Sequence, residues 1–181
     1  MNYNELSEEE QIDLVKEDGS RIQYIADPSE AVQLAAVSHS AFITSHTTGP
    51  NGDKIVVLKN VPALQFIANP SHAIKLASVQ WSGETIRFID EPSEDLQIAA
   101  VSQVGRAIQY IKDPSVVVQL AALRNDYRVL EMIECPSKEA IIVGLIGVIT
   151  NEPVDWKETI REYIEDHCDW PEMNIFRKYI E

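Results

Sequence analysis

The sequence predicts an all-α protein, an α-solenoid of stacked two-helix repeats with a helical cap at each end. Three observations lead to this prediction. A Pro-Ser pair recurs along the chain, an apolar run precedes each pair, and an alanine-rich helical pattern follows it. The last four pairs are spaced by 22 residues, a period typical of repeats that stack on one another. The pairs begin at Pro28, Pro70, Pro92, Pro114 and Pro136.

The apolar run before each pair predicts a short first helix. These runs are Ile22–Ile25, Leu64–Ile67, Ile86–Ile89, Ile108–Ile111 and Leu130–Ile133. In three units a glycine stands nine residues before the proline, at Gly19, Gly83 and Gly105. We expect each glycine to end the preceding helix in a left-handed turn.

The second helix of each unit is expected to begin at the proline, which suits the first helical position because its missing N–H would have no partner there. We predict that the residue before it is the N-cap, since an Asp or Asn side chain accepts from a free N–H of the first turn. Glu30 and Glu94 then fall at the third position, where a glutamate completes a capping box. The predicted caps are Asp27, Asn69, Glu91, Asp113 and Cys135.

Small residues in the second helices predict close packing. Alanine recurs at Ala35, Ala77, Ala99 and Ala121, where it lets a neighbouring backbone approach. A helix pair of this size cannot bury its own apolar face, so the units are expected to stack.

The domain organisation follows from the repeat register. Residues 1–18 predict an N-terminal capping helix, and helical repeats are expected over 19–150. A degenerate unit is expected at about 40–60, because the interval from Pro28 to Pro70 is two residues short of two periods; within it, 46–53 is predicted to be an exposed loop. Residues 151–181 leave the register and predict a C-terminal helical cap, with a partner- or self-binding surface as the alternative.

The run from Asp113 to Ala122 carries the pattern Asp-Pro-Ser-x-x-Val-Gln-x-Ala-Ala. This pattern resembles the HEAT and leucine-rich-variant class of helical repeats, and it is even more similar to short uncharacterised repeats of bacterial and bacteriophage proteins. The resemblance covers about residues 19–147. It implies a helical-repeat fold that binds other macromolecules, and a phage or bacterial protein acting on a host system would fit it.

The net charge of −14 is unevenly distributed. Residues 1–30 hold nine acidic and two basic residues and residues 151–181 hold nine and four, whereas the middle of the chain is nearly neutral. Polar ends that keep a repeat array in solution explain this charge. The alternative is attraction to a basic partner or imitation of a nucleic-acid backbone. Direct binding of nucleic acid is not expected, because phosphate contacts need clustered Lys and Arg.

The sequence also bounds the compartment. The first residues carry neither a basic start nor an apolar stretch, so no secretory signal is expected. The longest apolar run, residues 140–149, is too short for a bilayer, and we expect no membrane association. Two cysteines, Cys135 and Cys168, fit a reducing cytoplasm better than a disulfide framework.

No motif predicts catalysis, a metal site or a cofactor. The four histidines and two cysteines lack metal-binding spacing, and no phosphate-binding glycine loop or nucleophile motif occurs. Acidic pairs near the helix starts are explained by capping. The sequence therefore predicts a protein that is not an enzyme.

The best candidate for binding is a polar residue that recurs five positions after the proline. The candidate site residues are Gln33, Lys75, Gln97 and Gln119 in this position, with His39 and Trp81 at the end of the second helix. We expect them to form a stripe on an outer face, with Trp81 as an anchor for a protein partner. Repetition alone would produce the same stripe.

Together these features predict a non-enzymatic repeat scaffold that binds another protein, and the acidic charge favours a basic partner. The alternative function is an acidic mimic of nucleic acid that inhibits a nucleic-acid-binding protein. The sequence leaves the oligomeric state open.

Overall fold

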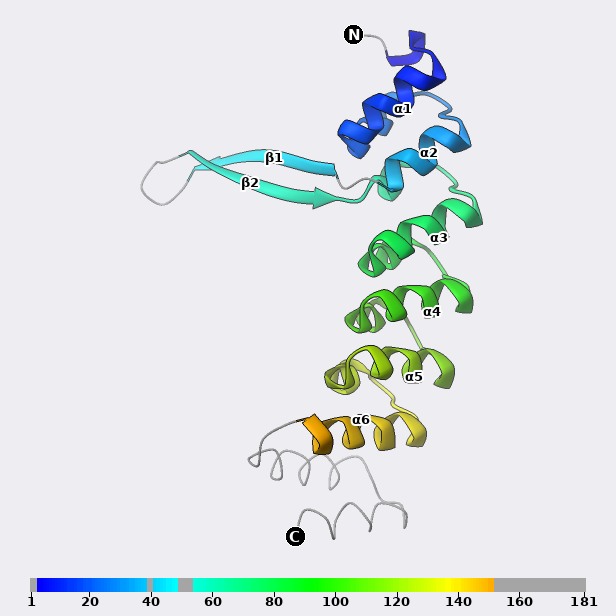
Figure 1. Ribbon diagram of the computed structural model, residues 1–181, viewed down its shortest axis with the longest axis vertical. Helices are drawn as coiled ribbons and strands as arrows, with labels where there is room; N and C mark the ends of the chain where they lie inside the picture. Colours follow the sequence, from blue (N-terminus) through cyan, green and yellow to red (C-terminus); the bar gives the residue numbers. More distant parts are fainter. Residues whose placement is uncertain (1–2, 39–40, 49–53, 152–181) are drawn as a thin grey trace.

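The computed structural model describes residues 3–38, 41–48 and 54–151, and this part of the chain is mainly helical. The α-helices lie one after another along the long axis of the molecule, and a β-hairpin projects from the side between α2 and α3 (Figure 1). The prediction of a helical protein is confirmed. The α-helices are α1 Glu8–Glu17, α2 Glu30–Val37, α3 His72–Trp81, α4 Glu94–Gln103, α5 Val116–Asn125 and α6 Lys138–Asn151.

A short 3₁₀ helix precedes each α-helix from α2 onward, where the sequence predicted a first helix. The tighter winding is visible at the helix end, where the N–H of Ile111 donates to the carbonyl of Ile108 three residues back, at 3.0 Å. These elements are η2 Gly19–Tyr24, η3 Ala63–Phe66, η4 Gly83–Phe88, η5 Gly105–Tyr110 and η6 Tyr127–Met132, with η1 Tyr3–Glu5 ahead of α1. One η-helix and the following α-helix form a unit.

Each unit contributes the same apolar positions to one continuous core. In the fourth unit these are Ile108 of η5, Ile111 directly after it, and Val118, Ala122 and Leu123 of α5, none more than 7% exposed. In three units a fully buried alanine, Ala36, Ala100 or Ala122, follows directly after an alanine that the sequence singled out. The predicted close contacts are therefore displaced by one residue, because Ala35, Ala77, Ala99 and Ala121 are only partly buried.

The turn between the two helices of a unit differs from the prediction. The α-helix begins two residues after the proline, and the serine between them is the N-cap: the Ser115 Oγ accepts from the N–H of Val118 at 3.4 Å. The predicted caps Asp27, Asn69, Glu91 and Asp113 instead have φ between 47° and 51°. Asp and Asn tolerate this left-handed conformation better than other non-glycine residues, which explains their recurrence before the proline.

The glutamates that begin α2 and α4, Glu30 and Glu94, join neighbouring units rather than completing a capping box. Ser71 Oγ donates to the carboxylate of Glu30 at 3.0 Å, and Ser115 makes the same contact with Glu94. Where His72 replaces the glutamate, its Nε2 lies 2.9 Å from Asp95 of the next unit. We call this row of polar contacts between successive units the seam.

Helix α1 belongs to the same register. Ser7 and Glu8 stand 22 residues before Ser29 and Glu30, and Ser29 donates to the carboxylate of Glu8. Ser7 and Glu10 form the predicted capping box. The N-terminal helix is therefore the α-helix of a further unit in which Leu6 replaces proline. The predicted C-terminal cap at 152–181 lies outside the described residues.

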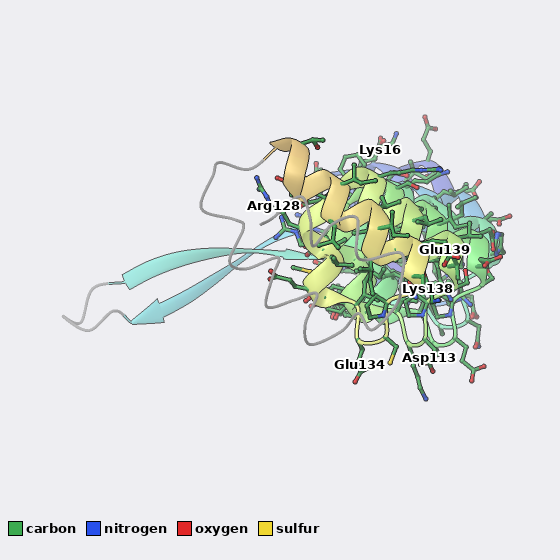
Figure 2. All side chains as sticks on the ribbon, turned by 90° about the horizontal axis from the view of Figure 1, so that it is seen from below. Lys16, Asp113, Arg128, Glu134, Lys138 and Glu139 are labelled. Atoms are coloured by element: carbon green, nitrogen blue, oxygen red, sulfur yellow. The ribbon has the colours of Figure 1, made fainter. Side chains whose placement is uncertain are left out.

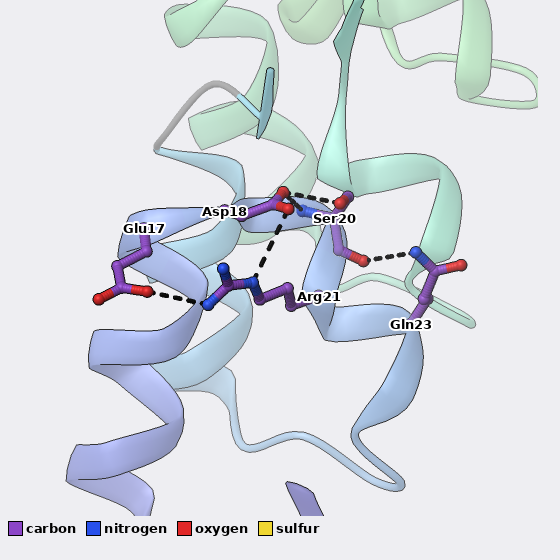
Figure 3. Close-up of polar contacts among 5 residues, drawn as sticks. All are labelled: Glu17, Asp18, Ser20, Arg21 and Gln23. Carbon is purple, nitrogen blue, oxygen red and sulfur yellow. Dashed lines mark hydrogen bonds and ion pairs between the residues drawn. The ribbon is translucent and has the colours of Figure 1, made fainter. Parts of the chain in front are cut away.

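A polar cluster joins α1 to η2 (Figure 3). Asp18 caps η2, accepting from the N–H of Ser20 at 3.0 Å and from its hydroxyl at 2.6 Å. Arg21 pairs with Glu17 at 2.9 Å and lies 3.8 Å from Asp18. Gln23 donates to the carbonyl of Ser20 at 2.9 Å. Side-chain hydrogen bonds and ion pairs therefore hold this junction together.

The glycines at the start of η4 and η5 are required by close packing and not by a left-handed turn. A Cβ on Gly83 would lie 2.3 Å from the carbonyl oxygen of Ala100, and one on Gly105 would lie 2.9 Å from that of Ala122. The N–H of Gly105 donates to the side chain of Asn125 at 2.8 Å. In these two units, therefore, η and α helices approach at the glycine.

The last described unit exchanges the small and the large residue across this contact. Tyr127 stands where Gly105 stands one unit earlier, and Gly147 stands in the position of Asn125. A Cβ on Gly147 would lie 2.4 Å from the Cβ of Tyr127. In both units one of the two residues in contact is therefore a glycine, but in the last described unit it lies in the α-helix and not in the η-helix.

The predicted degenerate helical unit at about 40–60 is wrong. Strands β1 Ala41–Thr48 and β2 Lys54–Val61 form an antiparallel hairpin, with Ala41 opposite Val61 and Thr48 opposite Lys54. The contact between Glu30 and Ser71 shows that the units on either side of the hairpin are direct neighbours. The 42-residue interval is thus one period with an insertion and not two periods.

We expect Gly147→Asn alone to destabilise the fold by about 1–3 kcal/mol, because its side chain overlaps Tyr127. Adding Tyr127→Gly recreates the Gly105–Asn125 arrangement and should recover part of that loss. Urea unfolding of both single variants and the double variant measures the coupling. Strictly additive changes in the free energy of unfolding would contradict the idea that the residues at positions 127 and 147 compensate for each other.

The seam contact between Glu94 and Ser115 is expected to contribute beyond capping. Ser115→Ala should cost more than Ser137→Ala, which removes only a cap worth about 1 kcal/mol, since Val116 stands where the glutamate would be. A double-mutant cycle with Glu94→Ala, followed by urea unfolding, should give a coupling of about 0.5–1 kcal/mol. Zero coupling would mean that the seam does not stabilise the fold.

The seam contact at Asp95 predicts a pH dependence. The hydrogen bond from Ser93, aided by His72, holds the pKa of the Asp95 carboxyl below its ordinary value. Its stabilisation is therefore present above the unfolded pKa and is lost as pH falls through the lowered folded pKa. The difference in unfolding free energy between wild type and Asp95→Asn should be largest near neutral pH and shrink in acid. A constant difference would contradict this role.

Candidate functional site

The predicted glutamines form hydrogen bonds within the fold. The side-chain amides of Gln33, Gln97 and Gln119 each donate to the carbonyl of the proline of their own unit, at 2.7–3.0 Å. Gln119 is 5% exposed and also bonds the backbone of Cys135 and Ser137 in the next unit. The predicted position on an outer face is therefore wrong for Gln119, and the three amides hold the turns.

Of the other predicted site residues, Lys75 takes the position of these amides in its own unit, whereas Trp81 lies apart from them. Lys75 is half-buried in α3, and Trp81 is 50% exposed at the far end of the same helix. His39 lies outside the described residues. The structure thus separates Trp81 from the first turns of the α-helices, where the glutamines lie.

A different row of large side chains is exposed in four units and half-buried in one. Four residues before each proline stands an aromatic residue or, in the last described unit, a methionine. Tyr24, Phe88, Tyr110 and Met132 are between 36% and 57% exposed, and Phe66 is half-buried. We call this row, Tyr24, Phe66, Phe88, Tyr110 and Met132, the aromatic face.

Contacts across the units show that these side chains are neighbours. The guanidinium of Arg87 lies 4.7 Å from the ring centre of Phe88 and 5.9 Å from that of Tyr110 in the next unit. The Tyr3 and Tyr24 rings stack, with centres 5.8 Å apart. Phe88 and Tyr110 of successive units are therefore neighbours, and a cation lies against both rings.

Two hollows open along this face at equivalent places. Each lies between the corner of one unit, formed by its isoleucine, acidic residue and proline, and the face residue of the next unit. The first, of about 320 Å³, is lined by Asp27 and Phe66, and the second, of about 240 Å³, is lined by Asp113 and Met132. The repeat thus generates the same recess twice.

Carboxylates without protein partners surround the aromatic face. Eight acidic residues of the described chain take part in none of its ion pairs or side-chain hydrogen bonds, and all but Glu9 and Glu139 stand next to a face residue or in the turn that follows one. Asp113 and Glu134 project from one edge of the stack, and the hairpin leaves it on a different side (Figure 2). The six carboxylates at the face belong to Asp27, Asp90, Glu91, Asp113, Glu131 and Glu134.

The described residues show no other chemistry that would define a site. No group of three or more metal-ligating side chains comes together among them, and none of their helices has the length and apolar character needed to cross a bilayer. Cys135 is an exposed free thiol, whereas His167 and Cys168 lie outside the described residues.

Comparison of the chain with protein-family models, with curated proteins and with solved structures finds no match to any of them. The resemblance to HEAT-like repeats therefore stays a prediction from the sequence pattern.

The sequence contained a signal for the aromatic face that the apolar runs concealed. In Ile108-Gln109-Tyr110-Ile111 the two isoleucines are buried and already fill the core, which leaves the ring between them facing outward. A large aromatic in the same position of four units, next to a polar residue, indicates a surface row.

Proposed function

We propose that the protein is a non-enzymatic α-solenoid of HEAT-like repeats that binds another protein through its aromatic face. The observation that carries this proposal is the regular exposure of one large side chain per unit, with Tyr24 and Met132 about half exposed. Rows of exposed aromatic and methionine side chains are costly in water unless a partner covers them. Aromatic residues also dominate binding energy at protein interfaces.

The alternative, an acidic mimic of nucleic acid, has less support. Many carboxylates of the stack have local partners: Glu30 and Glu94 contact serines of the seam, Asp18 caps η2, and Glu17 pairs with Arg21. These carboxylates add to the net charge, but their hydrogen bonds and ion pairs hold parts of the fold together. The unpartnered carboxylates gather around exposed rings, and such a surface favours a protein ligand with apolar as well as cationic groups.

We expect the triple variant Tyr24→Gln/Phe88→Gln/Tyr110→Gln to lose its protein partner while it keeps its helical circular dichroism and its unfolding midpoint within a few degrees. Trp81→Gln is the matched control, because it removes an aromatic of similar exposure outside the face. Quantitative cross-linking and capture from the native host compare the three proteins. A partner retained by the triple variant and lost by Trp81→Gln would move the site to the end of α3.

A further inference from the structure

We propose that the aromatic face binds an extended, arginine-containing segment in the polyproline II conformation, with a basic side chain at every third residue. This inference rests on the proposed protein-binding function and adds the chemistry and spacing of the ligand. Three properties of the face support this ligand: its charge, the geometry of its rings and the spacing of the units.

The charge of the face selects a cation. Six unpartnered carboxylates surround the five face residues, against the two cations Arg87 and Lys112. Opposite charge attracts the ligand over distances of about 8–10 Å at physiological salt and orients its approach. A neutral or acidic segment would leave these carboxylates without counter-charges.

The rings select arginine in particular. Arg87 already shows the binding mode, since its guanidinium lies against Phe88 and also within 5.9 Å of the Tyr110 ring centre. A planar guanidinium stacks on aromatic rings and forms paired hydrogen bonds with carboxylates, which an ammonium group does less well. Each hollow offers both groups, a carboxylate from Asp27 or Asp113 and an apolar wall from Phe66 or Met132.

The layer spacing selects the backbone conformation. Packed helices lie about 8–10 Å apart, so equivalent positions of successive units repeat at that distance. A polyproline II helix advances about 9.3 Å in three residues and returns every third side chain to the same face. A β-strand covers a similar distance in three residues, but its side chains alternate, so every second layer would meet a side chain that points away.

The positions of the two hollows set a minimum length. They are separated by three layers, or about 24–30 Å, because one lies between the units of Pro28 and Pro70 and the other between those of Pro114 and Pro136. Nine polyproline II residues span about 28 Å. A segment of roughly ten to twelve residues is therefore the shortest that places an arginine in both hollows.

The test uses fluorescence anisotropy with the full chain and labelled twelve-residue peptides. One peptide repeats Arg-Pro-Pro four times, and the other has the same composition with its arginines in adjacent pairs. We expect the evenly spaced peptide to bind at least about tenfold more tightly, and the preference to vanish in Tyr24→Gln/Phe88→Gln/Tyr110→Gln.

Two charge variants distinguish binding at this site from non-specific electrostatic attraction to the protein. Asp113→Asn/Glu134→Gln should weaken binding of the spaced peptide several-fold, whereas Glu9→Gln/Glu139→Gln, with the same change in net charge, should leave it unchanged. Equal weakening by both variants, or equal binding of the two peptides, would overturn the three-residue register. No binding of either peptide would overturn the basic ligand, while the capture experiment with Trp81→Gln as control would still decide whether the face binds a protein.

Discussion

In three units the serine that follows the proline makes the contact on which the stack depends, namely Ser29, Ser71 and Ser115. Its oxygen accepts from the first turn of its own α-helix, and its hydroxyl reaches back to the unit before, as Ser71 does to Glu30. One side chain thus begins a helix and fixes its distance from the preceding layer. The turn in front of it must place the serine there, which explains why Asp27 and its counterparts take a left-handed conformation and why Gln33 closes the turn from inside.

The aromatic face follows from the same geometry. Because the seam and the buried isoleucines hold successive units in equivalent positions, the residue between those isoleucines recurs at one place on the surface. Exposure of Tyr110 therefore follows from burial of Ile108 and Ile111. The neighbouring turn adds Asp113, whose left-handed backbone directs its carboxylate away from the stack, as Figure 2 shows. The buried isoleucines and the left-handed turn stabilise the fold, and they also place rings and carboxylates next to each other.

The sequence predicted the helices well, because a 22-residue period with fixed apolar positions is typical of stacked helical units. It misplaced the helix starts, since the sequence before each α-helix offers two cap positions, and the structure decides for the serine, whose oxygen accepts from the first turn while the residue before the proline takes a left-handed conformation. The hairpin was missed because the interval from Pro28 to Pro70 resembles two periods, although 54–61 is rich in β-branched residues. The predicted outer-face position is wrong for Gln119, because the recurrence of Gln97 and Gln119 accompanies a repeated internal hydrogen bond; binding through the other predicted residues stays a prediction.

The last described joint differs from the others in its polar chemistry, since Val116 replaces the seam glutamate and Gln119 bridges to the backbone of Cys135 and Ser137 instead. The small-for-large exchange, Tyr127 facing Gly147, lies inside the last described unit, between η6 and α6, so this unit differs in its interior as well. The units are therefore not interchangeable parts. An engineered chain that duplicates the α4 and α5 pair repeats the Glu94–Ser115 contact, whereas moving the α6 unit away from α5 removes the bridge from Gln119, so neighbouring units carry contacts specific to their joint.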